Sequence, residues 1–407
     1  MKFLFVHHSF PGQFGMLLRH LIAQGVHQLV FLTHASQVQA APPGVTVVRY
    51  TAAPTSFRTH KDARPFDEAM RRAQAVAEVA SGLRAAGFVP DVIIGHEGWG
   101  DTLNLRDVWP GVRQIGFREY FYHEHGTDVG FDPEFPVSSA QLPGVRARNA
   151  VATLALLQGH AGVSPTGWQR SLYPGWAQPG IHLVEDAVDL DTSRPDPGAR
   201  HRGFTLPGVS IPAGAEVVTF VASSLEPYRG LHTMFRTLPT LMARPGLHVL
   251  VLGEAIGTYG PPPPQGQRWW DIFRAETARG IDPARLHWPG RVFHPDCTRV
   301  LQRSDVHLYL SYPFIVSWSL REALACGCAV VAADTEPVRE FIHAGRTGQL
   351  VPPLDPGAVS DAVTALLDQP GMREVLGRGA RQWAEAHFQP ERHLAGWEAL
   401  LAAPPHG

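Results

Sequence analysis

One stretch of the chain combines residue types that could hold an anion beside a sugar ring. Residues 310–331 read as a strand, a loop, a helix, a glycine stop and a second strand. Ser317 or Ser319 is a candidate N-cap for that helix, because a hydroxyl there can accept from free backbone N–H groups. The same helix end offers N–H groups to a phosphate. Glu322 falls about one turn inside, where its carboxylate could accept from both hydroxyls of a ribose. An exposed helix glutamate is the alternative interpretation.

A second set of polar residues follows strands in the first half of the chain. His96 and Glu97 come directly after one apolar run, and Glu119 follows the next. Ligands bind at the carboxyl ends of parallel strands, so His96 and Glu119 are candidate catalytic residues. Glu119 could instead pair with Arg118 or another neighbour.

Other histidines and cysteines do not have the spacing of a metal or redox site. Residues 7–8 and 123–125 place no two ligands on one helix face or in a known zinc loop. The cysteines, at 297, 326 and 328, are too few and too clustered for a disulfide framework, which indicates a reduced compartment. No Gly-x-Gly-x-x-Gly follows a strand, and this disfavours an NAD-dependent oxidoreductase.

Two successive series of alternating strands and helices must position these residues. The first series has predicted strands at 3–6, 28–33, 45–50, 91–95, 114–117 and 163–165 and helices at 16–23, 65–86 and 150–160. The second has strands at 217–221, 248–252, 286–288, 306–310 and 329–332, with helices between and after them. This alternation predicts an α/β fold of parallel, doubly wound sheets, two Rossmann-like domains facing each other across a cleft. We expect domains at 1–190 and 191–387, a linker within 186–212, and a last helix at about 388–403 that packs back on the first domain.

Composition narrows the class of protein. A chain of 407 residues suits two domains of about 200 residues each. The formal net charge of −2 gives no sign of nucleic-acid binding. The N-terminus is apolar for too few residues to be a signal peptide, and no apolar run is long enough to span a membrane, so we expect a cytoplasmic location. The 40 glycines and 36 prolines indicate many loops, where sites are built.

The segment Glu322–Gly327 resembles the signature of retaining glycosyltransferase family 4, whose members have the GT-B fold. Further motifs are similar to those of this family, and of a bacterial branch of it, along nearly the whole chain: Pro11–Phe14, His96–Gly100, Ser164–Thr166, Glu226–Gly230, Gly290–Val292, Pro337–Ile342 and Gly345–Val351. Together these motifs are specific, whereas any one of them alone would be weak.

The resemblance implies a role for each matching residue. Arg229 would neutralise the diphosphate of a nucleotide-sugar donor, and the backbone at Ser317–Ser319 would cradle it. Glu322 would bind the ribose, and the loop at Arg291 and Val292 would flank the base. The implied donor-binding set is Gly12, Gln13, Arg229, Gly230, Arg291, Val292, Phe314, Ser317, Trp318, Ser319 and Glu322. Gly12 and Gln13 lie on the loop after the first strand, where the backbone would approach a ligand closely.

Two positions depart from the family pattern. Phe314 stands where the family has a first glutamate, eight positions before Glu322, that meets the sugar. Ser223-Ser224 replaces an arginine expected upstream of Arg229. Sugar recognition therefore either differs from the family or uses backbone groups. One charge of the diphosphate either stays unpaired or is neutralised by another residue.

The resemblance predicts a retaining glycosyltransferase that moves a sugar to a hydroxyl-bearing acceptor, which could be a sugar, a lipid-linked molecule or a small molecule. It implies bacterial glycan, glycolipid or natural-product glycoside synthesis, no cofactor and no essential metal. Membrane association would be peripheral at most. A non-catalytic nucleotide-sugar-binding homologue is the alternative, and a sugar-nucleotide epimerase of the same fold is a more distant one.

Overall fold

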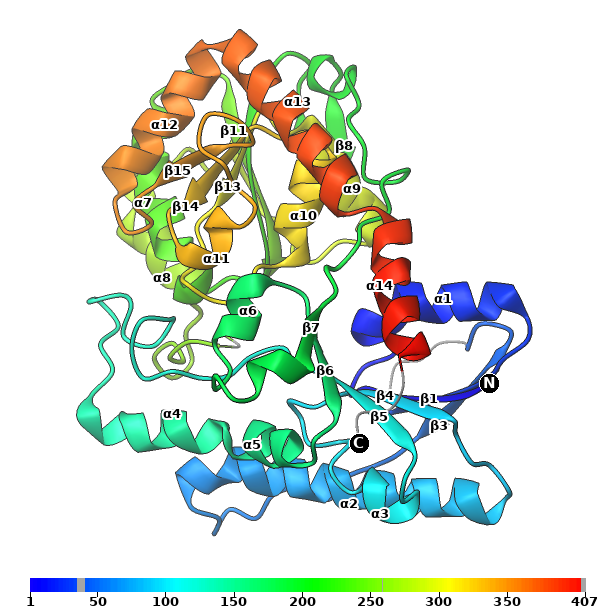
Figure 1. Cartoon of the computed structure of the whole chain (residues 1–407). Helices are drawn as coiled ribbons and strands as arrows, with labels where there is room; N and C mark the ends of the chain where they lie inside the picture. The colour runs from blue at the N-terminus through cyan, green and yellow to red at the C-terminus, as the bar shows by residue number, and fades with distance from the viewer. Residues whose placement is uncertain (35–40, 258, 404–407) are drawn as a thin grey trace. The chain divides into compact units, whose positions relative to one another are not determined.

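The computed structural model describes residues 1–34, 41–257 and 259–403, which form two compact units (Figure 1). Unit 1 contains residues 1–124 and 137–187 and the C-terminal residues from Pro390. Unit 2 contains residues 125–136 and 188–389. The segment 125–136 therefore belongs with the second unit, whereas its position in the sequence had placed it in the first domain.

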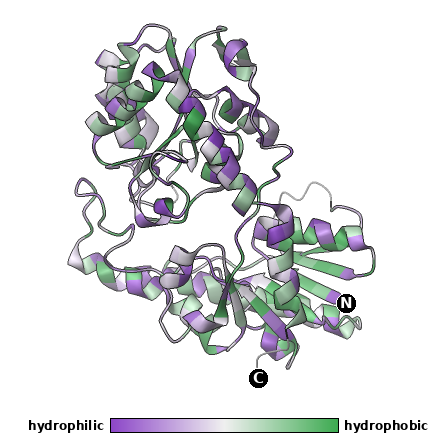
Figure 2. Ribbon diagram, turned by 45° about the horizontal axis from the view of Figure 1, so that its top comes forward, coloured by the Kyte–Doolittle hydropathy of each residue, from purple (hydrophilic) through white to green (hydrophobic). Residues whose placement is uncertain are grey.

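Unit 1 is built on a parallel sheet with the strand order β3-β2-β1-β4-β5-β6-β7. The strands are β1 Lys2–Val6, β2 Gln28–Thr33, β3 Val45–Arg49, β4 Val92–His96, β5 Arg113–Phe117, β6 Ala161–Ser164 and β7 Ile181–Leu183. Their sequences are nearly continuous apolar runs, which is typical of parallel strands covered on both faces, and Figure 2 colours many of these residues as hydrophobic. In β1, Phe3 and Phe5 enter the core on one face and Leu4 and Val6 the core on the other.

Helices cover both faces of this sheet. They are α1 Gly15–Gln24, α2 Arg64–Ala85, α3 Leu105–Val108, α4 Leu142–Arg148, α5 Ala150–Leu157, α6 Gly167–Ser171 and α14 Pro390–Ala402. The helix predicted at 65–86 is confirmed as α2, and its buried residues Ala69, Ala73, Val76 and Ala80 recur at helical spacing. The C-terminal α14 packs on α1, with the rings of Trp397 and Phe14 6.2 Å apart.

Unit 2 contains a second parallel sheet, with the order β12-β11-β10-β13-β14-β15. The strands are β10 Glu216–Ser224, β11 Leu247–Glu254, β12 Leu286–His287, β13 Val306–Tyr309, β14 Val330–Ala333 and β15 Gln349–Val351. The helices are α7 Leu231–Met242, α8 Trp269–Glu276, α9 His294–Arg303, α10 Trp318–Ala325, α11 Glu336–Arg339, α12 Pro356–Asp368 and α13 Pro370–His387. The alternating strand-helix order predicted from the sequence is confirmed in both units.

The predicted linker contains secondary structure that its sequence did not predict. Phe204–Leu206 (β8) and Val209–Ile211 (β9) form an antiparallel hairpin. Its alternate residues are buried against the core of unit 2, beside Val217 and Leu250. No helix among the described residues is long and apolar enough to cross a membrane.

Candidate functional site

Arg229 of unit 2 is a buried cation that has no carboxylate partner in the part of the chain that the structure describes. It ends the single 3-10 turn Pro227–Arg229 that follows β10. Only 6% of its surface is exposed. Its Nη1 donates to the carbonyl of Ile315 at 3.1 Å and, at 3.4 Å, to the hydroxyl of Ser311, while its Nε has no partner. Among the described residues, no carboxylate lies within ion-pair distance. A buried cation that no negative group neutralises favours the binding of an anionic ligand.

Gly230 lets the chain turn directly from Arg229 into α7. Its φ is +79°, and a Cβ would stand 2.4 Å from the carbonyl oxygen of Leu310. A side chain is therefore excluded both by backbone conformation and by space. This close approach joins the Arg229 turn to the loop that follows β13.

Replacing Gly230 by alanine is expected to destabilise the protein by about 3 kcal/mol, the sum of the left-handed strain and the clash. Gly246→Ala is the matched control, because Gly246 has φ +74° but nothing within 4 Å of the place that a Cβ would take. That change should cost about 1 kcal/mol. Thermal or urea unfolding of the two variants measures the difference, and equal losses would contradict the close approach at Gly230.

Phe314 is buried and packs beside Arg229. Its apolar ring cannot make the sugar contact of the glutamate that the family has at this position. Its ring lies 5.0 Å from that of Tyr259, and the Arg229 guanidinium carbon lies 5.7 Å from its centroid. Tyr259 also faces the guanidinium, at 5.2 Å. Aromatic faces attract a cation without neutralising it. Phe314 therefore supports Arg229 from the side and leaves its charge for another group.

The amino end of α10 is positioned by hydroxyl groups. Ser317 occupies the N-cap position, as expected, but its side chain makes no cap hydrogen bond. Its hydroxyl contacts that of Ser319 at 2.6 Å, and the Ser319 hydroxyl also donates to the carbonyl of Val221 at 3.1 Å. The backbone N–H of Ser317 donates to the hydroxyl of Tyr309. The N–H groups of Trp318 and Ser319 are thus the ones in the first turn that could serve an anion.

Glu322 is held by His294, a residue that no sequence motif had pointed to. Nε2 of His294 lies 2.7 Å from Oε1 of Glu322, whose side chain is only 12% exposed. The hydrogen bond to Glu322 raises the pKa of His294. Glu322 is therefore not the exposed helix glutamate of the alternative interpretation. Oε1 of Glu322 is already bound to His294, so a ribose would share the carboxylate with that histidine.

The predicted base-flanking loop is only loosely held. Arg291 is 80% exposed and lies 3.5 Å from a carboxylate oxygen of Glu254. Val292 is half-buried against the core beneath the β8–β9 hairpin. Neither side chain is fixed by contacts as strong as those of Arg229 and Glu322.

In unit 1, the structure brings together Gln13, His96 and Glu119 at the carboxyl ends of β1, β4 and β5. Nε2 of His96 lies 3.3 Å from one oxygen of Glu119, and Nε2 of Gln13 donates to the other at 3.1 Å. Burial alone would raise the pKa of Glu119, but the hydrogen bond and charge of His96, with help from Gln13, lower it overall. The result is an ionised carboxylate whose side chain is still 26% exposed.

A glycine is required at position 12 because the side chain of His7 occupies the space that a Cβ would need. The φ of Gly12 is +55°, and a Cβ would stand 2.5 Å from Nδ1 of His7. This space was expected to serve the close approach of a ligand, but the His7 ring fills it. The ring of His7 also meets that of His96 edge-on at 5.3 Å. The sequence around His7 carried no signal for the support that His7 gives to His96.

Glu97 and Arg118 form a buried structural pair. Nε of Arg118 donates to Oε2 of Glu97 at 2.9 Å. Gly116 and Gly162 leave the space for them, because a Cβ at either glycine would clash with one of these side chains. Arg118 is thus occupied by Glu97, and Glu119 pairs with His96 instead.

Buried histidines make the stability of both units depend on pH. Burial lowers the pKa of His7 to about 4 and that of His307, in β13, to about 3. Each imidazole stays neutral in the folded state, whereas the unfolded chain takes up a proton near pH 6.5. The stability they contribute is complete above pH 6.5 and is lost as pH falls toward those values. At pH 4.5 we expect a loss of about 3 kcal/mol for each histidine.

Thermal melts between pH 7.5 and 4.5 measure this dependence. The melting temperature should fall with pH, and a His307→Gln variant should show a shallower fall than the unsubstituted protein. An equal slope in the two proteins would contradict the buried neutral state of His307.

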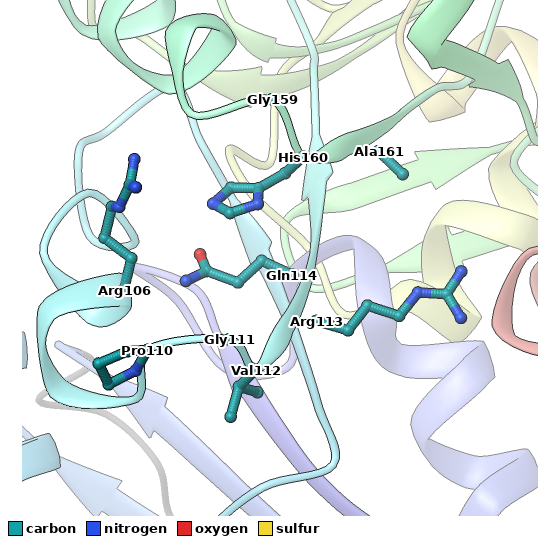
Figure 3. A pocket seen from close by; sticks show the side chains of 9 residues that line it. All are labelled: Arg106, Pro110, Gly111, Val112, Arg113, Gln114, Gly159, His160 and Ala161. Atoms are coloured by element: carbon teal, nitrogen blue, oxygen red, sulfur yellow. The ribbon is translucent and has the colours of Figure 1, made fainter. Parts of the chain in front are cut away.

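A cavity and a cluster of possible metal ligands lie among residues that the sequence did not predict as site residues. A cavity of about 270 Å³ lies at the amino ends of β5 and β6 and contains none of the predicted site residues (Figure 3). Arg113 beside it is occupied by carbonyl groups of α14. In unit 2, Asp132, Glu134 and His232 could together ligate a metal ion, but Glu134 already binds Arg236 through both of its oxygens.

Comparisons with known proteins agree with this geometry. Residues 25–193 match the Glycosyl transferase family 4 group, and residues 215–369 match Glycosyl transferases group 1. The GDP-mannose-dependent alpha-(1-6)-phosphatidylinositol monomannoside mannosyltransferase of Mycolicibacterium smegmatis is 29% identical over 75% of each chain. The D-inositol 3-phosphate glycosyltransferase of Saccharomonospora viridis is 30% identical over 51% of this chain and 47% of its own.

Solved structures show the same fold. Sucrose-phosphate synthase from Thermosynechococcus elongatus superposes with a TM-score of 0.73 at 18% identity, covering 98% of each chain. The HepE protein of Anabaena, in complex with UDP and glucose, gives a TM-score of 0.68 at 15% identity, covering 99% of each chain. The GT-B fold class predicted from the sequence is confirmed. Both halves of the chain thus match one enzyme family, and the chain belongs to the retaining, nucleotide-sugar-dependent glycosyltransferases of family 4.

Proposed function

We propose that this chain transfers a hexose, with retention, from a nucleotide-diphosphate sugar to a hydroxyl of an inositol-containing acceptor. The observation that carries the proposal is the buried Arg229 guanidinium, which has neutral oxygens and aromatic faces around it and, among the residues described, no carboxylate. The diphosphate of the donor supplies the missing negative charge. The inositol acceptor follows the relatives, two of which are named for phosphatidylinositol monomannoside and inositol 3-phosphate.

In this proposal the donor is held by unit 2 at three points. Arg229 binds the diphosphate, and the N–H groups at the start of α10 bind its oxygens. Glu322 accepts from the ribose hydroxyls and shares its carboxylate with His294. Arg291 and Val292 flank the base, and the largely exposed side chain of Arg291 can contact its flat ring.

The residues act by orientation and by stabilising the leaving group. The bond between the sugar and the diphosphate oxygen breaks, and the acceptor oxygen forms its bond on the same face of the sugar. The acceptor proton passes to the leaving phosphate oxygen. Arg229 stabilises the charge that develops on the diphosphate, and fixed groups of this kind are usually the largest contribution to catalysis. We propose that no metal is essential, because Arg229 and the helix end supply this positive potential.

Unit 1 is proposed to bind the acceptor through Glu119 and His96. The Glu119 carboxylate is ionised, held by two neighbours and partly open to solvent. It can accept a hydrogen bond from the attacking hydroxyl and orient it. The three cysteines are free, which agrees with a reducing, cytoplasmic location; a lipid-linked acceptor would bring the protein to a membrane surface.

Glu119→Gln is expected to lower kcat/KM for the acceptor about 10–100-fold, the loss of one charged hydrogen bond. Binding of the nucleoside diphosphate should not change, because Arg229, the start of α10 and Glu322 lie in unit 2 and a glutamine at position 119 can still accept from Gln13. Steady-state kinetics and titration calorimetry measure the two quantities. Glu124→Gln, which removes a half-buried carboxylate paired with Arg146, is the control and should leave both unchanged. Weaker nucleotide binding by Glu119→Gln would contradict its assignment to the acceptor.

A second candidate function is nucleotide-sugar binding without transfer. The presence of Phe314, packed against the rings of Tyr228 and Tyr259 where the family has a glutamate, favours it. Incubation with UDP-, GDP- and ADP-sugars, with and without inositol and inositol phosphate, discriminates the two. Release of nucleoside diphosphate only with an acceptor supports transfer, and binding with no release under any condition supports the second function.

A further inference from the structure

The segment 125–136 folds as part of unit 2, although the chain belongs to unit 1 immediately before it and after it. This segment contains the buried carboxylate of Asp132, which is 4% exposed. Oδ2 of Asp132 accepts from the hydroxyl of Tyr312 and lies 2.9 Å from Nε2 of His232. Oδ1 accepts from the backbone N–H of Glu134 at 2.8 Å. Burial would raise the pKa of Asp132, but its bonds to His232 and Tyr312 lower it, so the carboxylate is ionised.

The two side chains that Asp132 holds belong to the two segments beside Arg229, the start of α7 and the loop after β13. His232 is the second residue of α7, three positions after Arg229. Tyr312 directly follows Ser311, whose hydroxyl accepts from Arg229. The backbone N–H of Tyr312 also donates to the carbonyl of Tyr228, next to Arg229, at 2.9 Å.

Aromatic contacts continue this arrangement to the guanidinium. The rings of Tyr312 and Tyr228 are 5.1 Å apart, and Tyr228 meets Phe314 edge-on at 6.0 Å. Phe314 in turn packs beside Arg229. A change at Asp132 thus reaches Arg229 through backbone hydrogen bonds, through Ser311 and through tilted and edge-on ring contacts.

We propose that Asp132 is a positioning residue for the donor diphosphate site. It fixes Tyr312 and His232, and through them the direction in which Arg229 points, without touching the donor. Its negative charge is used by His232 and Tyr312, which leaves Arg229 uncompensated for the diphosphate. A segment bounded on both sides by the acceptor-binding unit therefore completes the donor site. This inference rests on the proposed function, in which Arg229 binds the diphosphate.

The test is titration calorimetry of the full chain with UDP and with GDP, together with steady-state kinetics. Asp132→Asn keeps the shape of the side chain but removes its charge. We expect it to weaken nucleoside diphosphate binding about tenfold, since small misplacements of a binding group are costly, and to raise the donor KM while the acceptor KM stays unchanged. Tyr312→Phe should have the same effect, and the double variant should be no weaker than the stronger single variant.

Glu134→Gln is the matched control in the same segment. The carboxylate of Glu134 binds Arg236, on the exposed side of α7, through both of its oxygens. Its replacement should lower the melting temperature slightly and leave nucleotide affinity unchanged. Unchanged affinity in both Asp132→Asn and Tyr312→Phe, or an equal loss in Glu134→Gln, would overturn the inference. Arg229→Met separates the proposed donor site from the positioning role of Asp132. If Arg229→Met also binds nucleotide normally, the proposed donor site is wrong. If only Arg229→Met loses nucleotide binding, the donor site stands and Asp132 has no role in it.

Discussion

Replacing Arg229 by methionine is expected to lower kcat/KM for sugar transfer about 100–1000-fold, as removal of one group that stabilises developing charge usually does. Methionine keeps much of the apolar bulk of the side chain, so the packing against Phe314 and Tyr259 is largely preserved. The charge that the buried guanidinium presents is lost. The free energy of unfolding should fall little or even rise, because an uncompensated buried cation is removed.

Arg244→Met is the control for this prediction. Arg244 is a partly exposed arginine of the same unit, and it is paired with Glu216 and Asp368. Its replacement should leave kcat/KM unchanged. Arg229→Lys is informative as well. Lysine keeps the positive charge, but its ammonium group cannot reproduce the planar arrangement of guanidinium N–H donors, so we expect partial activity. Full activity in Arg229→Met would contradict the role of Arg229 in stabilising the leaving group.

Replacing Glu322 by alanine is expected to raise the donor KM about 10–100-fold. The carboxylate is positioned to accept from ribose hydroxyls, and each charged hydrogen bond contributes about 1.5–3 kcal/mol. The effect should depend on whether the nucleotide contains ribose or 2′-deoxyribose. The unsubstituted protein should bind UDP or GDP more tightly than the 2′-deoxy analogue, and Glu322→Ala should bind the two equally.

This comparison separates ribose recognition from a loss of structure. A misfolded variant would lose both nucleotides, whereas removal of the ribose contact lowers the affinity for the ribose form more than that for the 2′-deoxy form, which keeps only the 3′-hydroxyl. Glu336→Ala, in the first turn of α11, removes an exposed glutamate from the same unit and serves as the control. A Glu322→Ala variant that still prefers ribose over deoxyribose would contradict the assignment.

Much of the fold could be predicted from the sequence because the signals were local. The apolar runs of β1 and β4 and the helical spacing in α2 each lie within one element. Arg229, Gly230 and Glu322 belong to short motifs, so their placement at strand and helix ends followed from the same pattern. The hairpin Phe204–Ile211 was missed because its strands are only three residues long, and the prolines around them resembled a linker.

The rest of the candidate site depends on contacts between distant positions. His294 meets Glu322 across 28 residues, and Gln13 meets Glu119 across 106. Asp132 reaches Tyr312 across 180 residues. No spacing within a motif encodes such pairs. The segment 125–136 was assigned to the first domain by its position in the chain, and only the tertiary structure places it with unit 2.

The measurement that tests the central claim most directly is titration calorimetry of the full chain with UDP and GDP, repeated on Arg229→Met and Glu322→Ala. Our account predicts that at least one of the two nucleotides binds the unsubstituted protein and that each substitution weakens this binding at least tenfold, while both variants keep their melting temperature. Binding that is the same in all three proteins would contradict the account, because the donor would then be held by other residues.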